Sequence, residues 1–159
     1  MKKNIRLLPL IIAALLLASC SNKMIFDEKV LFPDANWAFE YKEIVFDVPI
    51  KDISKPCSVV LELDLIGTPN VEKFQITITI ITPSGGELIR NVMFNFNNPK
   101  EPFIQGATKN EKIYRLIAYP KRYFSETGTY TFKVDQYSHK ADNYGIRSLR
   151  MYIEKLKEE

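Results

Sequence analysis

The chain has 159 residues, 46% of them hydrophobic and 26% charged, with a formal net charge of +3 at pH 7. This length corresponds to one domain that is large enough to bury a core of its own. Three of the 22 basic residues lie in a leader that we expect to be removed, which leaves 19 basic against 19 acidic residues. Proteins that bind nucleic acid generally carry a surplus of positive charge, so the composition excludes nucleic acid as a partner.

The first 19 residues have the three parts of a secretory signal peptide. A positively charged start precedes an apolar run from Leu7 to Leu17, which the small residues Ala18 and Ser19 follow. The run is too short to cross a bilayer as a helix, which takes about 20 apolar residues. We therefore expect residues 1–19 to be a cleaved signal peptide and not a membrane anchor.

The residue after this leader predicts a lipid anchor. Leu17-Ala18-Ser19-Cys20 resembles the lipobox of bacterial lipoproteins, in which the cysteine thiol receives a diacylglyceryl group and its amine usually receives a fatty acid such as palmitate. Two or more acyl chains hold a protein stably on a bilayer. We predict lipidation at Cys20, a tether over residues 20–24 and one folded domain over residues 25–159. An ordinary signal peptide followed by a chance cysteine is the alternative.

Two segments alternate between apolar and polar residues with the period of two that is typical of half-buried strands. In residues 58–66, four apolar side chains are predicted to face the core: Val59, Leu61, Leu63 and Leu65. In residues 73–81, the corresponding side chains are Phe74, Ile76, Ile78 and Ile80. The intervening positions, which include Glu62 and Asp64, are predicted to face water.

Similar patterns continue to the C-terminus. The turn residues Pro83, Gly85 and Gly86 predict a hairpin between the strand at 73–81 and a return strand at 88–96. Further strands are predicted at residues 41–50, 111–119, 128–137 and 145–156. The last segment also fits a helical spacing, but its alternation favours a strand.

Seven or eight short strands without intervening helices predict an all-β fold, a single antiparallel β-sandwich of the immunoglobulin-like or jelly-roll-like kind. The longest irregular stretch, residues 97–111, contains Phe103 among polar residues. Long loops in compact domains are often functional, so Phe103 is a candidate partner contact. The alternative is a loop that folds back over its own phenylalanine.

The sequence offers little for catalysis or for cofactor binding. With Cys20 lipidated, Cys57 has no intramolecular partner, and we expect it to be a small buried hydrophobe, with an intermolecular bridge as the alternative. His139, the only histidine, lies in a polar turn and is expected to be exposed. A Cys57–His139 nucleophilic pair is a further alternative. No metal site and no cofactor are predicted, because there is one histidine and no glycine-rich phosphate loop.

One pair of carboxylates lies close together in the sequence. Glycoside hydrolysis takes two carboxylates across a cleft. Glu62 and Asp64 lie two positions apart on one strand, and we interpret them as part of a solvated face. We therefore predict that the protein is not an enzyme, with a hydrolase of unrecognised site as an alternative.

Aromatic residues crowd the last third of the chain. Tyr130 and Phe132 alternate with polar residues and are predicted to be core, whereas alternation does not explain the segment Tyr-Pro-Lys-Arg-Tyr-Phe at 119–124. Tyrosine and arginine are enriched in the hot spots of protein interfaces. This segment therefore predicts a partner contact, with the candidate residues Arg122, Tyr123 and Phe124.

Several motifs follow one another in an order that is similar to one family of bacterial lipoproteins. After the lipobox cysteine come an acidic-aromatic strand, a proline, a tryptophan and a Phe-Asp-Val-Pro strand, matched here by Phe26-Asp27, Pro33, Trp37 and Phe46-Asp47-Val48-Pro49. The turn at 81–86, the strand at 128–136 and the closing segment at 144–155 are also similar. In these features the chain resembles a divergent member of the gliding-motility lipoprotein GldH family of Bacteroidota.

The resemblance implies an outer-membrane lipoprotein that serves gliding in motile species, with no established enzymatic activity and no cofactor. Ser21 stands where an aspartate would resemble an inner-membrane retention signal, and no acidic cluster of the kind that marks surface display follows. We therefore predict a lipid-anchored protein of the outer membrane that faces the periplasm and acts as an accessory subunit of an envelope protein assembly. The alternative is a ligand- or glycan-binding lipoprotein that uses exposed tyrosines.

Overall fold

A computed structural model describes residues 23–41, 43–97, 103–106 and 108–157 of the chain. The predicted signal peptide and the predicted lipidation site, Cys20, lie outside the described residues.

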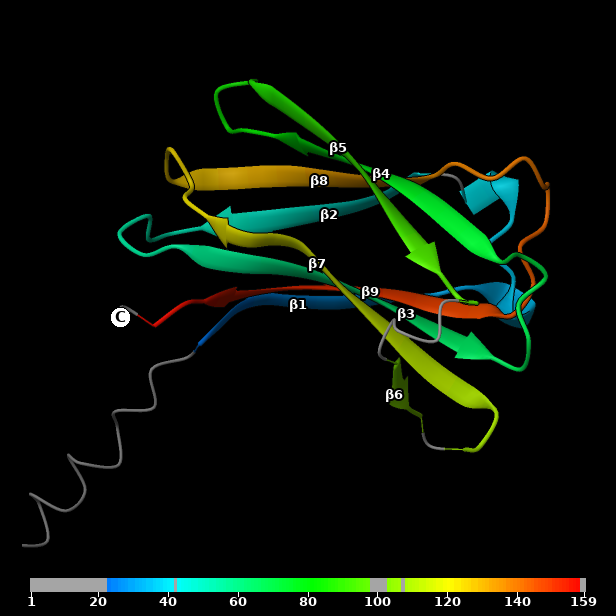
Figure 1. Cartoon of the computed structure of the whole chain (residues 1–159). Helices are drawn as coiled ribbons and strands as arrows, with labels where there is room; N and C mark the ends of the chain where they lie inside the picture. The colour runs from blue at the N-terminus through cyan, green and yellow to red at the C-terminus, as the bar shows by residue number, and fades with distance from the viewer. Residues whose placement is uncertain (1–22, 42, 98–102, 107, 158–159) are drawn as a thin grey trace, which may run out of the picture.

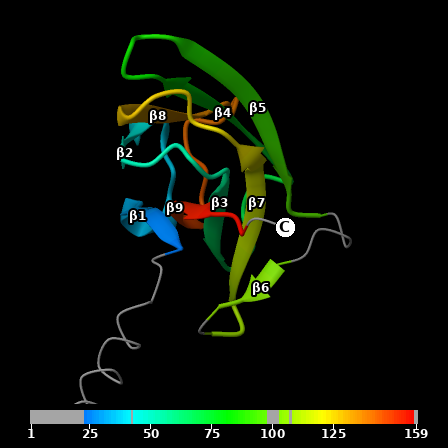
Figure 2. The ribbon, with the colours of Figure 1, turned by 90° about the vertical axis from the view of Figure 1, so that its left-hand side faces the viewer.

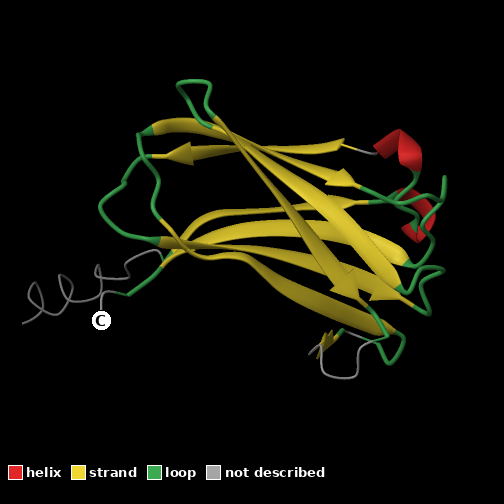
Figure 3. Cartoon of the chain, turned by 45° about the horizontal axis from the view of Figure 1, so that its top comes forward, coloured by secondary structure: helices red, strands yellow, loops and turns green. Residues whose placement is uncertain are grey.

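The described residues form two antiparallel sheets (Figure 1). The five-stranded sheet has the order β1-β9-β3-β7-β6, and the four-stranded sheet has the order β2-β8-β4-β5. In chain order the strands are β1 (Met24–Leu31), β2 (Glu43–Ile50), β3 (Cys57–Ile66), β4 (Lys73–Ile81), β5 (Glu87–Asn95), β6 (Phe103–Gln105), β7 (Glu111–Arg122), β8 (Gly128–Gln136) and β9 (Ile146–Lys155). Two short 3-10 turns, η1 (Pro33–Ala35) and η2 (Phe39–Tyr41), lie together at one end of the sandwich (Figure 3).

This architecture confirms the predicted all-β sandwich. The two sheets face each other, with β1 and β2 on one side and β5 and β7 on the other (Figure 2). Eight strands have eight residues or more, in line with the seven or eight expected, and β6 has only three. The closing segment is a strand, as its alternation predicted. The stretch at 97–111, predicted to be irregular, contains β6, because residues 103–105 pair with β7.

The core is formed where the inward positions of both sheets meet. In β2 and β4 every second residue is buried, as the period of two requires. Trp37 is fully buried and stacks on Phe32, with 4.7 Å between ring centroids. Tyr130 and Phe132 are core residues, as predicted. The predicted hairpin is also present, and Gly85 in its turn has a φ of +89°, which glycine adopts without strain.

In β3 the predicted alternation of burial is wrong. Glu62 and Asp64 point away from the core, but both are buried and not solvated. The reason is the strand order, since β3 is the central strand of its sheet and lies between β9 and β7. Side chains from these two neighbours cover its outer face.

An irregular register in β7 explains why the segment 119–124 does not alternate. Val60 pairs with Ile117 and Val59 pairs with Tyr119, so one step on β3 corresponds to two steps on β7. A second shift follows before Arg122. Each extra residue is a β-bulge that changes which side of the sheet the following side chains face. A period of two cannot be read through two bulges.

The two ends of the sandwich differ in what they contain. At one end, the backbone N–H of Lys155 donates to the carbonyl of Lys23, and Cys57 pairs in register with both Lys155 and Arg122. Lys23, the first described residue, therefore lies at the same end of the sandwich as Arg122. At the other end lie η1, η2 and the loop before β9, where the buried Asn143 donates to the carbonyl of Trp37.

In the part of the chain that the structure describes, no helix is both long and apolar enough to cross a bilayer.

Candidate functional site: a basic aromatic cluster between two strands

The residues predicted to form a partner contact are separated by the fold. Tyr123 is 60% exposed and Arg122 is half-buried, so both reach the surface. Phe124 is only 3% exposed and packs edge-on against Tyr130, with 4.9 Å between ring centroids. The expectation that Phe124 contacts a partner is therefore corrected, because the irregular β7 turns this ring into the core. The backbone of Phe103 lies in β6, while its side chain lies outside what the structure describes.

Residues from both sheets gather beside Arg122 to form a cluster of cations and aromatic rings. The guanidinium carbon of Arg122 lies 5.4 Å from the ring centroid of Tyr119, and that of Arg90 lies 5.1 Å from the same centroid. Lys121 Nζ lies 6.0 Å from the ring of Tyr123. We call these five residues the Arg90–Arg122 cluster: Arg90, Tyr119, Lys121, Arg122 and Tyr123.

The cluster carries positive charge that no described residue neutralises. Within the described ranges, no carboxylate lies within ion-pairing distance of Arg90, Lys121 or Arg122, whereas other cations of the domain are paired. Burial raises the pKa of the Tyr119 hydroxyl, although the two arginines act in the opposite direction. Tyr119 is therefore a neutral hydroxyl between two cations at neutral pH.

Two polar atoms of the cluster have no hydrogen-bond partner. The hydroxyl of Tyr119 and Nε of Arg122 are both buried and both unbonded among the described residues. Buried polar groups are nearly always hydrogen-bonded, because a buried group without a hydrogen bond costs about 1–3 kcal/mol of stability. Two such groups together, beside cations that no described residue pairs, mark a place where an anionic or hydrogen-bonding group would fit.

A different charged network lies on the outer face of the five-stranded sheet, and its carboxylates are paired with arginines, although Oδ1 of Asp64 is buried without a partner among the described residues. Glu62 accepts hydrogen bonds from Arg115 Nε at 2.8 Å and from Arg150 at 2.9 Å. Arg150 also binds Asp27, and Arg147 binds Asp64. These hydrogen bonds raise the pKa of all three arginines and lower the pKa of Asp27. The network holds strands β1, β3, β7 and β9 together, so Glu62 and Asp64 do not form a hydrolytic pair across a cleft.

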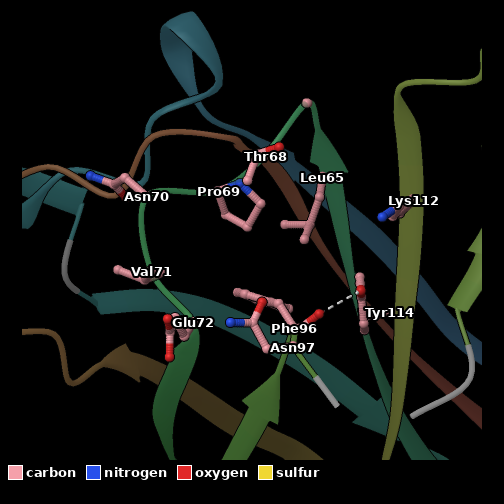
Figure 4. A pocket seen from close by; sticks show the side chains of 11 residues that line it. Leu65, Thr68, Pro69, Asn70, Val71, Glu72, Phe96, Asn97, Lys112 and Tyr114 are labelled. Carbon is pink, nitrogen blue, oxygen red and sulfur yellow. Dashed lines mark hydrogen bonds between the residues drawn. The ribbon is translucent and has the colours of Figure 1, made fainter. Parts of the chain in front are cut away.

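A pocket of about 360 Å³ opens at the far end of the sandwich, between the loop after β3 and the ends of β5 and β7 (Figure 4). Its wall combines apolar and polar side chains, among them Pro69, Asn70, Glu72, Phe96, Asn97 and Tyr114. The hydroxyl of Tyr114 donates to the carbonyl of Phe96 at 3.2 Å, which joins β7 to the end of β5. Amides, a carboxylate and aromatic rings in one hollow are the groups that bind sugars.

The sulfur and imidazole groups are not brought together. Cys57 is fully buried at the start of β3, which confirms its prediction as a core residue, and burial raises the pKa of its thiol. His139 is exposed in the loop before β9, at the opposite end of the sandwich. A Cys57–His139 nucleophilic pair is therefore not formed. Among the described residues, no three His, Cys, Asp or Glu side chains gather in a way that could hold a metal ion.

Arg90 is the member of the cluster that the sequence did not single out, whereas Tyr119 and Lys121 lie in the predicted contact segment 119–124 without being named as candidates. Arg90 lies in a return strand that was interpreted only for its apolar positions, and Tyr119 is 29 positions further along the chain. An arginine at a core-facing position of a strand, paired in register with Ile78, was the available signal. No family model matches the chain, and no curated protein and no solved structure is significantly similar to it.

Proposed function

We propose that this protein is a lipoprotein anchored through Cys20 to the outer membrane, where it faces the periplasm as a non-catalytic accessory subunit of an envelope protein assembly. In this proposal it resembles the GldH lipoproteins, whether in a gliding machinery or in a related assembly of a cell that does not glide. Its partners are the membrane, through the lipid, and at least one envelope protein.

The observation that carries the proposal is the Arg90–Arg122 cluster. Arginine and tyrosine are the residues most enriched in interface hot spots. Here they combine three unpaired cations with an exposed tyrosine and two unbonded buried polar atoms. A protein partner that supplies a carboxylate and apolar contacts would satisfy all of these groups at once.

The position of the cluster supports an assembly at the membrane. Arg122 lies at the end of the sandwich from which the tether leaves, since Cys57 pairs with both Arg122 and Lys155, and Lys155 bonds to Lys23. Lys23 is three positions after Cys20. With Cys20 lipidated, the cluster would be held close to the bilayer surface, within reach of other membrane-anchored proteins.

An affinity pull-down tests the proposal. The tagged full-length chain is recovered from detergent-solubilised outer membranes, with Cys20→Ala as the variant that cannot be lipidated. We expect discrete envelope proteins with the lipidated chain and a loss of these proteins with Cys20→Ala. If neither form recovers a protein, the proposed assembly role is wrong.

A matched pair of tyrosine variants assigns the contact to the cluster. Tyr123 is 60% exposed and Tyr137, in the loop after β8, is 61% exposed. We expect Tyr123→Ala to recover less partner than the unmodified chain, and Tyr137→Ala to recover the same amount. Equal losses with the two variants would contradict a role for the cluster.

The pocket beside Glu72 favours a second candidate, the binding of an envelope glycan. It has the volume of a small-molecule site and combines Glu72 with two asparagine amides and two aromatic rings. Calorimetric titration of the chain with soluble peptidoglycan fragments tests this function. Binding that is lost in Glu72→Ala but kept in Glu43→Ala, a carboxylate on the edge strand β2, would favour the glycan over a protein partner.

A further inference from the structure

Strand β5 is the long outer strand of the four-stranded sheet, and among the described residues only its side toward β4 is paired. Its nine residues pair with β4 in an unbroken register from Lys73–Asn95 to Ile81–Glu87. No other strand of the described chain pairs with the opposite side of β5. It contains no proline and no lysine, and its first five residues are all exposed. Such an edge readily pairs with an added strand.

The other edges of the sandwich are blunted in ways that prevent pairing. β2 contains Pro49, β1 has a register shift after Met24 and the consecutive charges Asp27-Glu28-Lys29, and β6 has three residues. The part of β7 that extends past β6 carries two bulges and Pro120. Charges, proline, bulges and short length are the usual protections of a sheet edge. β5 carries two charges, Glu87 and Arg90, but among these edges it alone combines full length with the absence of proline and of a bulge.

The hydrogen bonds at the two ends of the hairpin show which backbone N–H and C=O groups of β5 bond to β4 and which face the open edge. The N–H of Thr82 donates to Gly86, and the N–H of Phe96 donates to Glu72. Because bonded pairs alternate along an antiparallel ladder, the even-numbered residues of β5 bond to β4. Ile89, Asn91 and Met93 therefore direct their N–H and C=O groups to the open edge.

The side chains along this edge have two different characters. Ile89 and Met93 lie on the outer face of the sheet and are exposed. Arg90 lies on the inner face, over the ring of Tyr119, which Arg122 also contacts. A strand added to β5 would therefore lie next to apolar side chains on one face and next to two unpaired guanidinium groups on the other.

We propose that β5 accepts an extended segment of a partner protein as a fifth strand of its sheet, and that this segment carries carboxylates on the face that meets Arg90 and Arg122. The inference rests on the proposed function and specifies how the partner binds. Directly opposite side chains of neighbouring strands are about 5 Å apart at Cβ, so a carboxylate opposite Arg90 reaches its guanidinium. Apolar residues at the alternate positions would pack beside Ile89 and Met93.

The same charges argue against a second copy of this chain as the occupant. Two β5 strands paired about a two-fold axis near the middle of the strand would place the two Arg90 side chains opposite or diagonal to each other. Like charges at such positions are destabilising. An acidic strand from a different protein removes this repulsion and pairs the cations.

A pair of short peptides tests the inference directly. The probe is the capped peptide Thr-Val-Asp-Val-Asp-Val-Thr, and its control is Thr-Val-Lys-Val-Lys-Val-Thr. Each is added to the full-length chain in detergent micelles while amide hydrogen exchange is followed by NMR. We expect the acidic peptide to slow exchange about tenfold or more at Ile89, Asn91 and Met93, with little change at Leu88 and Val92. The lysine peptide should bind at least about tenfold more weakly than the acidic peptide.

Two variants separate strand pairing from charge. Ile89→Pro removes an N–H that points to the open edge and leaves the bonds to β4 intact, so it should abolish peptide binding, whereas Ile89→Thr should keep it. Arg90→Glu should reverse the preference and favour the lysine peptide. A reversal cannot be explained by misfolding, because misfolded protein would lose both peptides.

Three results would overturn the inference. The first is that the acidic peptide does not slow exchange in β5, and the second is that both peptides bind equally. The third is that β5 is protected without any peptide, to a degree that increases with protein concentration as a dimer forms. If the Ile89→Pro variant still recovers the partner in the pull-down, binding by strand addition to β5 is wrong, while the proposed function stands. Absence of any partner with the unmodified chain would instead remove the proposed function.

Discussion

The guanidinium of Arg90 on β5 lies over the ring of Tyr119 on β7, 5.1 Å from its centroid, so that one residue from each sheet meets at the open side of the sandwich. Arg122 lies near the same ring from the end of β7. The contact fixes two cations beside a buried hydroxyl that has no partner. It thus connects the unpaired edge of one sheet with the irregular strand of the other.

The unbonded hydroxyl of Tyr119 predicts a stabilising substitution. Tyr119→Phe removes a buried group that has no partner, so the isolated chain should gain up to about 1 kcal/mol in the free energy of unfolding. The matched variant is Tyr130→Phe, whose hydroxyl donates to the carbonyl of Glu126 at 3.1 Å, and it should lose about 1 kcal/mol. Urea unfolding followed by fluorescence measures both. Equal effects of the two substitutions would contradict the account of Tyr119.

The buried carboxylate of Glu62 predicts a destabilising substitution. Glu62→Gln removes the charge that holds Arg115 and Arg150, and we expect a loss of about 2 kcal/mol in urea unfolding. Glu43→Gln is the control, since its pair with Lys133 is longer, at 3.3 Å, and largely exposed, and it should change stability by less than about 1 kcal/mol. A loss for Glu62→Gln as small as that of the control would show that Glu62 is solvated.

The ion pair between Asp27 and Arg150 predicts a dependence on acid. Hydrogen bonds from Arg150 lower the pKa of Asp27 below its ordinary value of 3.8, so this pair stabilises the fold above that value and the contribution is lost as the pH falls through the lower folded-state pKa. The stability difference between the unmodified chain and Asp27→Asn should therefore shrink as the pH falls below about 4. The effect should stay under about 1 kcal/mol, because the pair is partly exposed.

Thermal unfolding at a series of pH values measures this difference. Asp34→Asn serves as the control, because no cation pairs with Asp34 among the described residues. Its offset from the unmodified chain should stay constant over the same range. A difference for Asp27→Asn that grows as the pH falls would have the wrong sign for the pair.

The buried thiol of Cys57 predicts low reactivity in the folded state. The side chain is fully buried and its pKa is raised by burial, so the reactive thiolate is scarce at neutral pH. We expect iodoacetamide to modify Cys57 only at denaturant concentrations that unfold the domain, as followed by mass spectrometry. Rapid modification of the native chain at pH 7 would show that the thiol is at the surface, and would favour the alternative that Cys57 forms an intermolecular disulfide.

Local alternation predicted most of the strands, and it did so because the period of two is written in neighbouring residues. Phe74 and Ile78 in β4, and Tyr130 in β8, are buried as their patterns indicated. The same reasoning was wrong for Glu62, and the lack of alternation at 119–124 led to the wrong prediction of an exposed Phe124. Whether an outward side chain is covered depends on the neighbouring strands, and whether a period continues depends on bulges that arise in pairing with a distant strand.

The sequence by itself determined the all-β class, the hairpin at Gly85 and the buried state of Cys57, and its leader and lipobox pattern predicts lipidation at Cys20. Each of these depends on residues that are close together in the chain. Only the tertiary structure decided that β3 is central, that β5 is an open edge, and that Arg90 and Arg122 share one ring. Strand order and edge exposure result from packing two complete sheets against each other, and no short segment contains that information.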